Sequence, residues 1–126
     1  MNDTDGFWLR VPREASSLAL IRAVVGSVAS RADLTYSQID DLRIAVAEAA
    51  AAMVAAPGSA ISFAVHLDPE PGRIRVELVA DPALDAPISF PPGSVPALIV
   101  SGLTDDLQVG EDDRGSWVRL EKGSAS

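Results

Sequence analysis

The sequence predicts an α+β fold, a two-layer sandwich in which helices cover one face of a mixed, mostly antiparallel sheet. Three observations lead to this class. Two segments with apolar residues at every third or fourth position, typical of helices, come early in the chain. Two segments in which apolar and other residues alternate, typical of strands, follow them around a turn-rich stretch. A third helical segment and a second alternating pair complete the pattern.

Length and composition limit what the chain can do. We expect its 126 residues to form one domain, with disordered tails at residues 1–6 and 123–126. The absence of cysteine excludes disulfides and thiolate metal sites, and the single histidine leaves too little for a histidine-based metal site. A net charge of -8 argues against nucleic-acid binding, since that affinity comes from basic residues. No apolar run suits a membrane span and no signal-peptide pattern opens the chain, so we expect a cytoplasmic protein without membrane contact.

The first strand is predicted at residues 7–11, where large apolar residues alternate with others before a proline. Its early position and the proline suggest an edge of the sheet. Residues 13–31 follow as a helix whose apolar surface is broadened by Leu20 and Val24, with Arg22 between them. Such a broad surface fits either burial beneath neighbouring segments or contact with a partner.

The second helix is predicted to begin after Thr35, which can form a capping box with Gln38, and to stop before Pro57. Glu48 stands in its C-terminal half, where the helix dipole does not favour a carboxylate. This glutamate is either an ordinary exposed residue or a residue with a chemical role. The stripe that should face the sheet consists of Ile39, Leu42, Val46, Ala49, Ala50 and Met53.

Two hairpins and a short helix are predicted in the second half of the chain. The turn of the first hairpin lies at residues 68–72, and His66, on the polar phase of its strand, is expected at the surface. Ser94 is the predicted N-cap of the short helix. The elements are predicted, in chain order, at residues 61–67, 73–80, 95–103, 107–109 and 116–120.

Residues 41–49, D-L-R-I-A-V-A-E-A, resemble the N-box helix of the RsbW-type anti-sigma factors. These are small serine kinases of the GHKL superfamily of histidine-kinase-like ATPases. In that family the helix carries E-x-x-x-N, in which the glutamate is the catalytic base and the asparagine coordinates the magnesium of ATP. The resemblance makes Glu48 a vestigial general base. It places Ala52, which offers no oxygen ligand to magnesium, at the position of the asparagine.

The family's two glycine motifs are replaced in this sequence. The adenine-binding motif D-x-G-x-G falls on Asp81 and the four residues after it, so Asp81 is the vestigial adenine contact that the resemblance implies. The second motif falls on Ser94 and Pro96, at the end of a proline-rich loop of residues 86–96 without lysine or arginine. Little there would balance a triphosphate. We therefore expect weakened or lost ATP binding and kinase activity, no bound cofactor and no metal site.

The resemblance implies an anti-sigma factor that binds an alternative sigma factor and holds it off RNA polymerase. In the family an arginine of the first helix contributes to that contact, and Arg22 takes this place, with Leu20 and Val24 beside it. A STAS-type anti-anti-sigma protein would release the sigma factor by competing with it for this chain. This exchange is the partner switching of stress responses. The chain is expected to form a homodimer, and its acidic charge suits the basic surface of a sigma factor.

Two alternatives stay open. In the first, Glu48 still serves as the base of an active serine kinase of a STAS protein, with magnesium held by substrate phosphates and water. In the second, the chain is a pseudokinase module that binds a STAS protein or a small ligand through the loop of residues 86–96.

Overall fold

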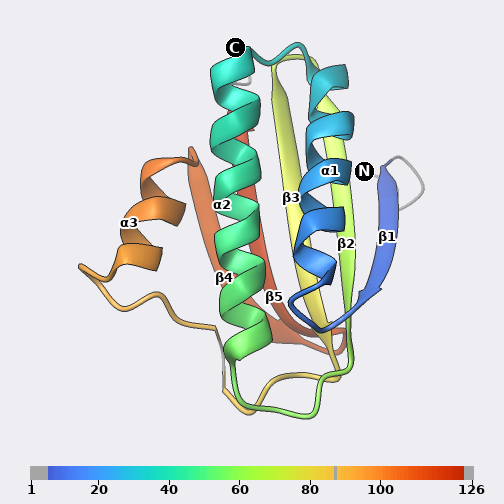
Figure 1. Ribbon diagram of the computed structural model, residues 1–126, viewed down its shortest axis with the longest axis vertical. Helices are drawn as coiled ribbons and strands as arrows, with labels where there is room; N and C mark the ends of the chain where they lie inside the picture. Colours follow the sequence, from blue (N-terminus) through green and yellow to red (C-terminus); the bar gives the residue numbers. More distant parts are fainter. Residues whose placement is uncertain (1–5, 87, 124–126) are drawn as a thin grey trace.

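The computed structural model describes residues 6–86 and 88–123. Within them, helices cover one face of a five-stranded sheet, with α1 and α2 side by side and α3 beside α2 (Figure 1). In chain order the elements are β1 (Phe7–Pro12), α1 (Ser17–Ala29), the 3₁₀-helix η2 (Ser30–Ala32), α2 (Tyr36–Ala55), β2 (Ser62–Glu70), β3 (Arg73–Asp81), α3 (Val95–Gly102), β4 (Asp106–Asp112) and β5 (Gly115–Gly123). The predicted two-layer α+β class is confirmed.

The sheet has the strand order β1-β2-β3-β5-β4, so β1 lies at an edge as predicted. In the described part of the chain all four strand pairings are antiparallel, whereas a mixed sheet was expected. The cause is the connection between β1 and β2. Each successive element reverses the chain direction, and because two helices intervene, the second strand returns antiparallel to the first. None of the described helices is both long and apolar enough to cross a bilayer.

The central helix α2 begins and ends where the sequence predicts. The Gln38 amide donates to Thr35 Oγ1 at 3.1 Å and the Thr35 amide donates to Gln38 Oε1 at 2.8 Å, which completes the capping box. The helix ends at Ala55, two residues before Pro57. Its predicted sheet-facing stripe is buried except at Ile39, which is half-buried.

The first helix begins later than predicted, at Ser17 instead of Arg13. The Arg13 amide donates to the Ile61 carbonyl at 2.9 Å, so this residue is drawn toward the start of β2. Its guanidinium caps the C-terminus of α2, where the last carbonyl groups lack partners within the helix. The carbonyl acceptors belong to Met53, Val54, Ala56, Gly58 and Ala60.

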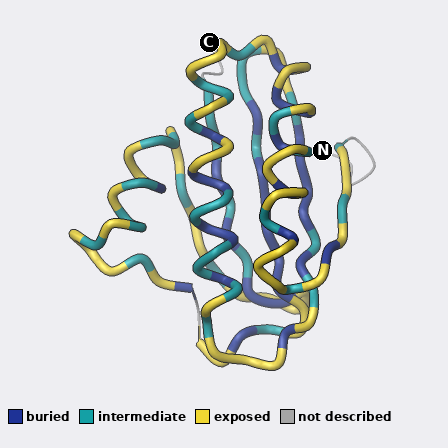
Figure 2. The backbone as a smooth tube through the Cα atoms, in the orientation of Figure 1, coloured by how far each residue is buried: buried dark blue, intermediate teal, exposed yellow. Residues whose placement is uncertain are grey.

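The core lies between the helices and the sheet, and Figure 2 shows buried positions concentrated where α1 and α2 cover β2, β3 and β5. On the strands, every second residue points into it, as the period of a strand requires. The largest fully buried side chains are Phe63, Ile21, Leu42, Met53, Leu67, Ile74, Leu78 and Leu120.

The opposite face of the sheet carries polar residues but is far from fully exposed. His66, expected at the surface, is only 9% exposed. The indole of Trp8, its register partner on β1, stacks on the imidazole with ring centroids 4.1 Å apart and an interplanar angle of 9°. The prediction failed because the polar phase of the strand says nothing about a large side chain on the neighbouring strand that covers it.

The ends of the sheet differ from the prediction in detail. Gly123, assigned to a disordered tail, is the last residue of β5, and its amide donates to Asp105 Oδ2 at 2.7 Å. The rest of the two predicted tails, apart from Gly6, lies outside the described residues. Strand β2 runs on to Glu70, beyond the predicted end at Leu67, so the hairpin turn is shorter than expected.

Candidate functional site

Helix α2 lies between α1 and α3 in the helical layer, so it has two lateral sides (Figure 1). Helical spacing places Glu48 on one stripe with Asp41, Ala45 and Ala52. This stripe belongs to the side away from α1, because Lys122 Nζ of β5 lies 3.3 Å from Asp41 Oδ2. The predicted base and the alanine at the magnesium position thus share one side of α2.

Glu48 is half-buried. Within the described part of the chain, no residue forms a hydrogen bond or an ion pair with its carboxylate. A carboxylate in this state can accept a proton from a hydroxyl held close to it. The methyl group of Ala52, one turn further on, adds nothing that would hold a cation.

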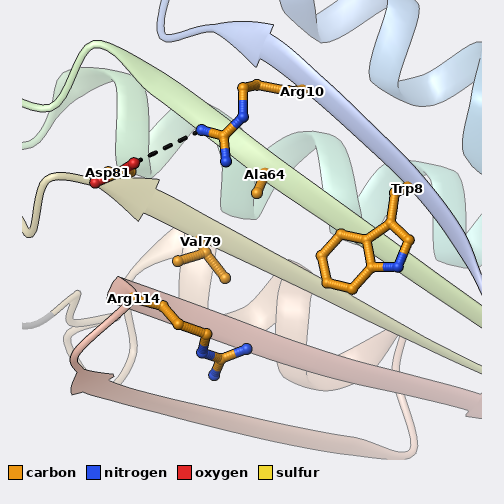
Figure 3. A pocket seen from close by; sticks show the side chains of 6 residues that line it. All are labelled: Trp8, Arg10, Ala64, Val79, Asp81 and Arg114. Atoms are coloured by element: carbon orange, nitrogen blue, oxygen red, sulfur yellow. Dashed lines mark ion pairs between the residues drawn. The ribbon is translucent and has the colours of Figure 1, made fainter. Parts of the chain in front are cut away.

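The structure does not bring Asp81 to Glu48. Ala80 points into the core at 0% exposure, so the next side chain, that of Asp81, lies on the helix-free face. Figure 3 shows its carboxylate beside Arg10, with the helices behind the sheet, and the Asp81 Oδ2–Arg10 Nη1 distance is 3.7 Å. The Asp81 carboxylate thus lies on the face of the sheet opposite to the helical layer that contains Glu48.

The segment after β3 packs against the hydrophobic core of the domain. Leu84 and Ile88 belong to the buried core, at 4% and 6% exposure, and Phe90 packs against it. The Leu84 amide donates to Ser116 Oγ at 2.9 Å, a contact that the sequence did not suggest. Residue 87 of the predicted loop lies outside the described residues.

Helix α3 keeps its capping but has no basic residue near its start. The Ala97 amide donates to Ser94 Oγ at 3.3 Å, which confirms the predicted N-cap, and Pro96 lies in the first turn. The sequence from Pro82 to Asp113 contains neither lysine nor arginine. A phosphate at this N-terminus would meet backbone amides but no cationic side chain.

The other side of α2 forms a groove with α1. One part, of about 330 Å³, is lined by Arg22, Asp40, Arg43 and Ile44. The adjoining part, of about 380 Å³, shares Arg43 with the first. Its remaining lining residues are Ala23, Gly26, Ser27, Ser30, Tyr36 and Ile39. Small residues on α1 therefore leave room between the two helices.

The three residues predicted to bind a partner do not form one surface. Arg22 lines the groove, whereas Leu20 and Val24 lie about 160–200° away around the axis of α1, on the side toward β1. There Leu20 is 49% exposed, Phe7 is 40% exposed, and the Arg31 guanidinium lies 5.5 Å from the Phe7 ring centroid. Residues two positions apart on a helix cannot share a face, which separates Arg22 from the other two.

Two groove residues were missed by the sequence reasoning. Tyr36 is 89% exposed and Ile44 is 50% exposed, both on the outer side of α2. The sequence contained a signal for them. Both apolar residues lie outside the sheet-facing stripe, and they are eight positions, or about two helical turns, apart. The two residues are about 80° apart around the helix axis, and exposed apolar residues on one side of a helix are typical of a contact surface.

Comparison with known proteins identifies relatives, although no protein-family model matches the chain. The anti-sigma-F factor RsbW of Mycobacterium tuberculosis strain CDC 1551 is 30% identical over 106 residues, or 84% of this chain and 62% of that protein. The serine-protein kinase RsbW of Bacillus subtilis strain 168 is 42% identical over 48 residues, or 38% of this chain and 30% of that protein. The chain thus spans less than two thirds of the length of these curated relatives.

A solved structure shares the fold. The crystal structure of the RsbU and RsbW domains of Rv1364c from Mycobacterium tuberculosis superposes with a TM-score of 0.64 at 12% identity, covering 95% of this chain and 34% of that one. At this identity the structural match establishes the fold alone. The evidence that the proteins are related comes from the sequence identity to the named relatives. Sequence and fold together make the chain a homologue of the RsbW proteins that shares the fold of an RsbW domain.

Proposed function

We propose that this chain is an anti-sigma factor that binds an alternative sigma factor and holds it off RNA polymerase, in the cytoplasm where the polymerase works. The observation that carries the proposal is the open groove between α1 and α2, in a chain related to a protein named as an anti-sigma factor. The groove is wide enough to receive side chains of a partner helix. Its apolar residues Tyr36 and Ile44 are exposed beside it.

Arg22 is the residue that we expect to contribute most to this contact. Among the residues that the structure describes, none forms an ion pair or hydrogen bond with it, whereas Arg43 is 3.4 Å from Asp40. Its guanidinium is thus available to a carboxylate of the sigma factor. A partner that straddles α1 would also reach Leu20 and Val24 on the far side of that helix.

The test is affinity purification of the tagged chain from its native cells without added nucleotide, followed by mass spectrometry. We expect a sigma factor among the bound proteins, and we expect Arg22→Glu to lose it. Arg75→Glu changes the charge equally on the opposite face of the sheet, beside Glu121, and should retain the sigma factor. Recovery of a STAS protein alone, or equal recovery by Arg22→Glu, would refute the proposed docking.

The inhibition that we propose does not require phosphotransfer. Ala52 offers no magnesium ligand, Asp81 lies on the helix-free face, and no basic residue stands between Pro82 and Asp113. Release of the sigma factor would then depend on competition by a STAS-type protein. We expect no saturable binding of Mg-ATP in a calorimetric titration, and sigma binding that ATP does not change.

One pair of observations favours the alternative of an active serine kinase. Glu48 is present and has no hydrogen-bond or ion-pair partner among the described residues, and the Bacillus subtilis relative is named a serine-protein kinase. The test is the transfer of radiolabelled phosphate from ATP to a co-purified STAS protein. Transfer that Glu48→Gln abolishes would establish kinase activity and overturn the proposal that inhibition works without phosphotransfer. A pseudokinase that binds only a STAS protein or a small ligand remains the outcome if no sigma factor is recovered.

We further propose that the chain forms a homodimer through its β1 edge. The opposite edge strand, β4, carries Asp106, Glu111 and Asp112, which discourage pairing with another strand, whereas Arg10 is the one charged residue of β1. Sedimentation equilibrium tests this. Phe7→Glu should yield monomers, while Val109→Glu, at the other edge and at similar exposure, should leave the dimer intact. The reverse result would refute the proposed interface.

A further inference from the structure

The helix-free face of the sheet contains a cavity of about 140 Å³ that the proposed function does not use (Figure 3). It is lined by Trp8, Arg10, Ala64, Val79, Asp81 and Arg114. We propose that this cavity binds a small organic carboxylate with one flat apolar group, of the size of benzoate. The site lies across the sheet from both the groove and Glu48, so it stands independently of sigma-factor binding.

The two guanidinium groups are held in place by other residues. Arg114 Nη1 donates to Glu77 Oε1 at 2.6 Å and its Nη2 donates to Asp112 Oδ2 at 2.9 Å, while Arg10 Nη1 donates to Ser62 Oγ at 2.9 Å. Each guanidinium has five N–H donors. Asp112 and Glu77 occupy the Nε and Nη2 donors of Arg114, which leaves one donor on its Nη1, whereas Arg10 keeps most of its donors. Figure 3 shows the two side chains on either side of Val79. A carboxylate there would meet cationic donors that are already oriented.

The remaining walls suit a flat apolar group. The Trp8 ring is held parallel to His66 at 4.1 Å and is 51% exposed, so it presents an aromatic surface of defined orientation. Ala64 and Val79 form the floor between the two arginines, and Val79 is 4% exposed. A ligand ring can cover these apolar atoms while its carboxylate faces a guanidinium.

Charge and size narrow the class of ligand. The lining holds two guanidinium groups and the Asp81 carboxylate, while Glu77 and Asp112, outside the lining, already hydrogen-bond to Arg114. A single carboxylate can accept hydrogen bonds from the remaining N–H groups of Arg10, whereas a dianion would face stronger repulsion from Asp81. Sites for drug-sized ligands measure roughly 300–1,000 Å³, so a cavity of 140 Å³ suits one ring or a short chain.

The test is a titration of the full chain with benzoate, monitored by the NMR chemical shifts of the amides and the indoles. Benzamide serves as the matched neutral control. We expect saturable shifts at the Trp8 indole and the amides around Arg10 and Val79 with benzoate and not with benzamide. Arg10→Gln should weaken binding about tenfold, the effect of losing one charged hydrogen bond. Arg75→Gln removes a positive charge from the same face outside the cavity and should not change the affinity.

Three results would overturn the proposal. These are shifts of equal size with benzamide, equal weakening by Arg75→Gln and Arg10→Gln, or no saturable shift at the cavity residues with benzoate. Thermal unfolding of both variants shows that they fold. Val79→Phe, which should fill the cavity from its floor and abolish the shifts, supplies a second variant that keeps both arginines.

Discussion

The two faces of the sheet bury their side chains by different physical means. On the covered face, apolar residues such as Phe63 and Leu78 are fully buried against the helices. On the helix-free face, Glu77 is only 5% exposed although no helix or strand of residues 6–86 and 88–123 forms a layer over it. Arg114 and Arg119 cover this carboxylate with their own side chains. The contrast shows that long polar side chains can shield a sheet face that has no second layer.

The charges on the helix-free face form a connected network around Glu77. Arg114 Nη1 lies 2.6 Å from Glu77 Oε1, and Arg119 Nη2 lies 2.9 Å from Glu77 Oε2. The Arg119 guanidinium also lies 4.8 Å from the centroid of the Trp117 ring. Burial raises the pKa of Glu77, but hydrogen bonds from the two arginines outweigh burial and hold this pKa below its ordinary value of 4.5.

The largest expected effect comes from the covered face. Phe63→Ala should lower the free energy of unfolding by about 3 to 5 kcal/mol, because a fully buried ring leaves a cavity. Val79→Ala, which changes a 4% exposed residue on the helix-free face, should cost about 1 kcal/mol. Urea unfolding monitored by circular dichroism measures both. Equal losses would mean that the two faces contribute to stability in the same way.

The second largest loss of stability is expected at the C-terminus of α2. Arg13→Met removes the donor that caps the C-terminus of α2 and should lower the free energy of unfolding by about 2 kcal/mol. Arg13→Lys keeps the charge but cannot reproduce the guanidinium fork, so it should recover part of the loss. An Arg13→Met variant as stable as the parent protein in urea would show that water replaces the guanidinium at these carbonyls.

A smaller effect, and a pH dependence, are expected on the helix-free face. Because the pKa of Glu77 is lower in the folded chain than its ordinary 4.5, its stabilising contribution is complete above that value and disappears as the pH falls through the folded pKa. Glu77→Gln should cost about 1 to 2 kcal/mol at neutral pH. Unfolding measured from neutral pH to below 4.5 should show a shallower loss in the variant. Parallel curves would contradict the role of the network.

The smallest effect is expected at Glu48. Since no described residue pairs with its carboxylate, Glu48→Gln should change the free energy of unfolding by less than about 0.5 kcal/mol. Sigma-factor binding should also remain unchanged, because Glu48 lies on the side of α2 away from the groove. Thermal unfolding and a binding titration check the two statements. A large loss of stability would assign this glutamate a structural role on the covered face.

Much of the fold could be predicted because its signals are local. The Thr35–Gln38 capping box, the apolar stripe of α2 and the alternation of the hairpin strands each arise from residues a few positions apart. The sites were predicted less well. The spacing of Arg22 and Leu20 already placed them on different faces of α1, but only the packed structure shows that Arg22 lines one groove with Arg43 and that Leu20 lies toward β1.

The sequence by itself determined the element order and the two-layer class, because periodicity and caps can be inferred from neighbouring residues. Only the tertiary structure decided that Trp8 covers His66, that Arg13 caps α2, and that Asp81 faces Arg10. These contacts join residues far apart in the chain. They depend on strand order and register, which fix the side of the sheet to which each side chain points.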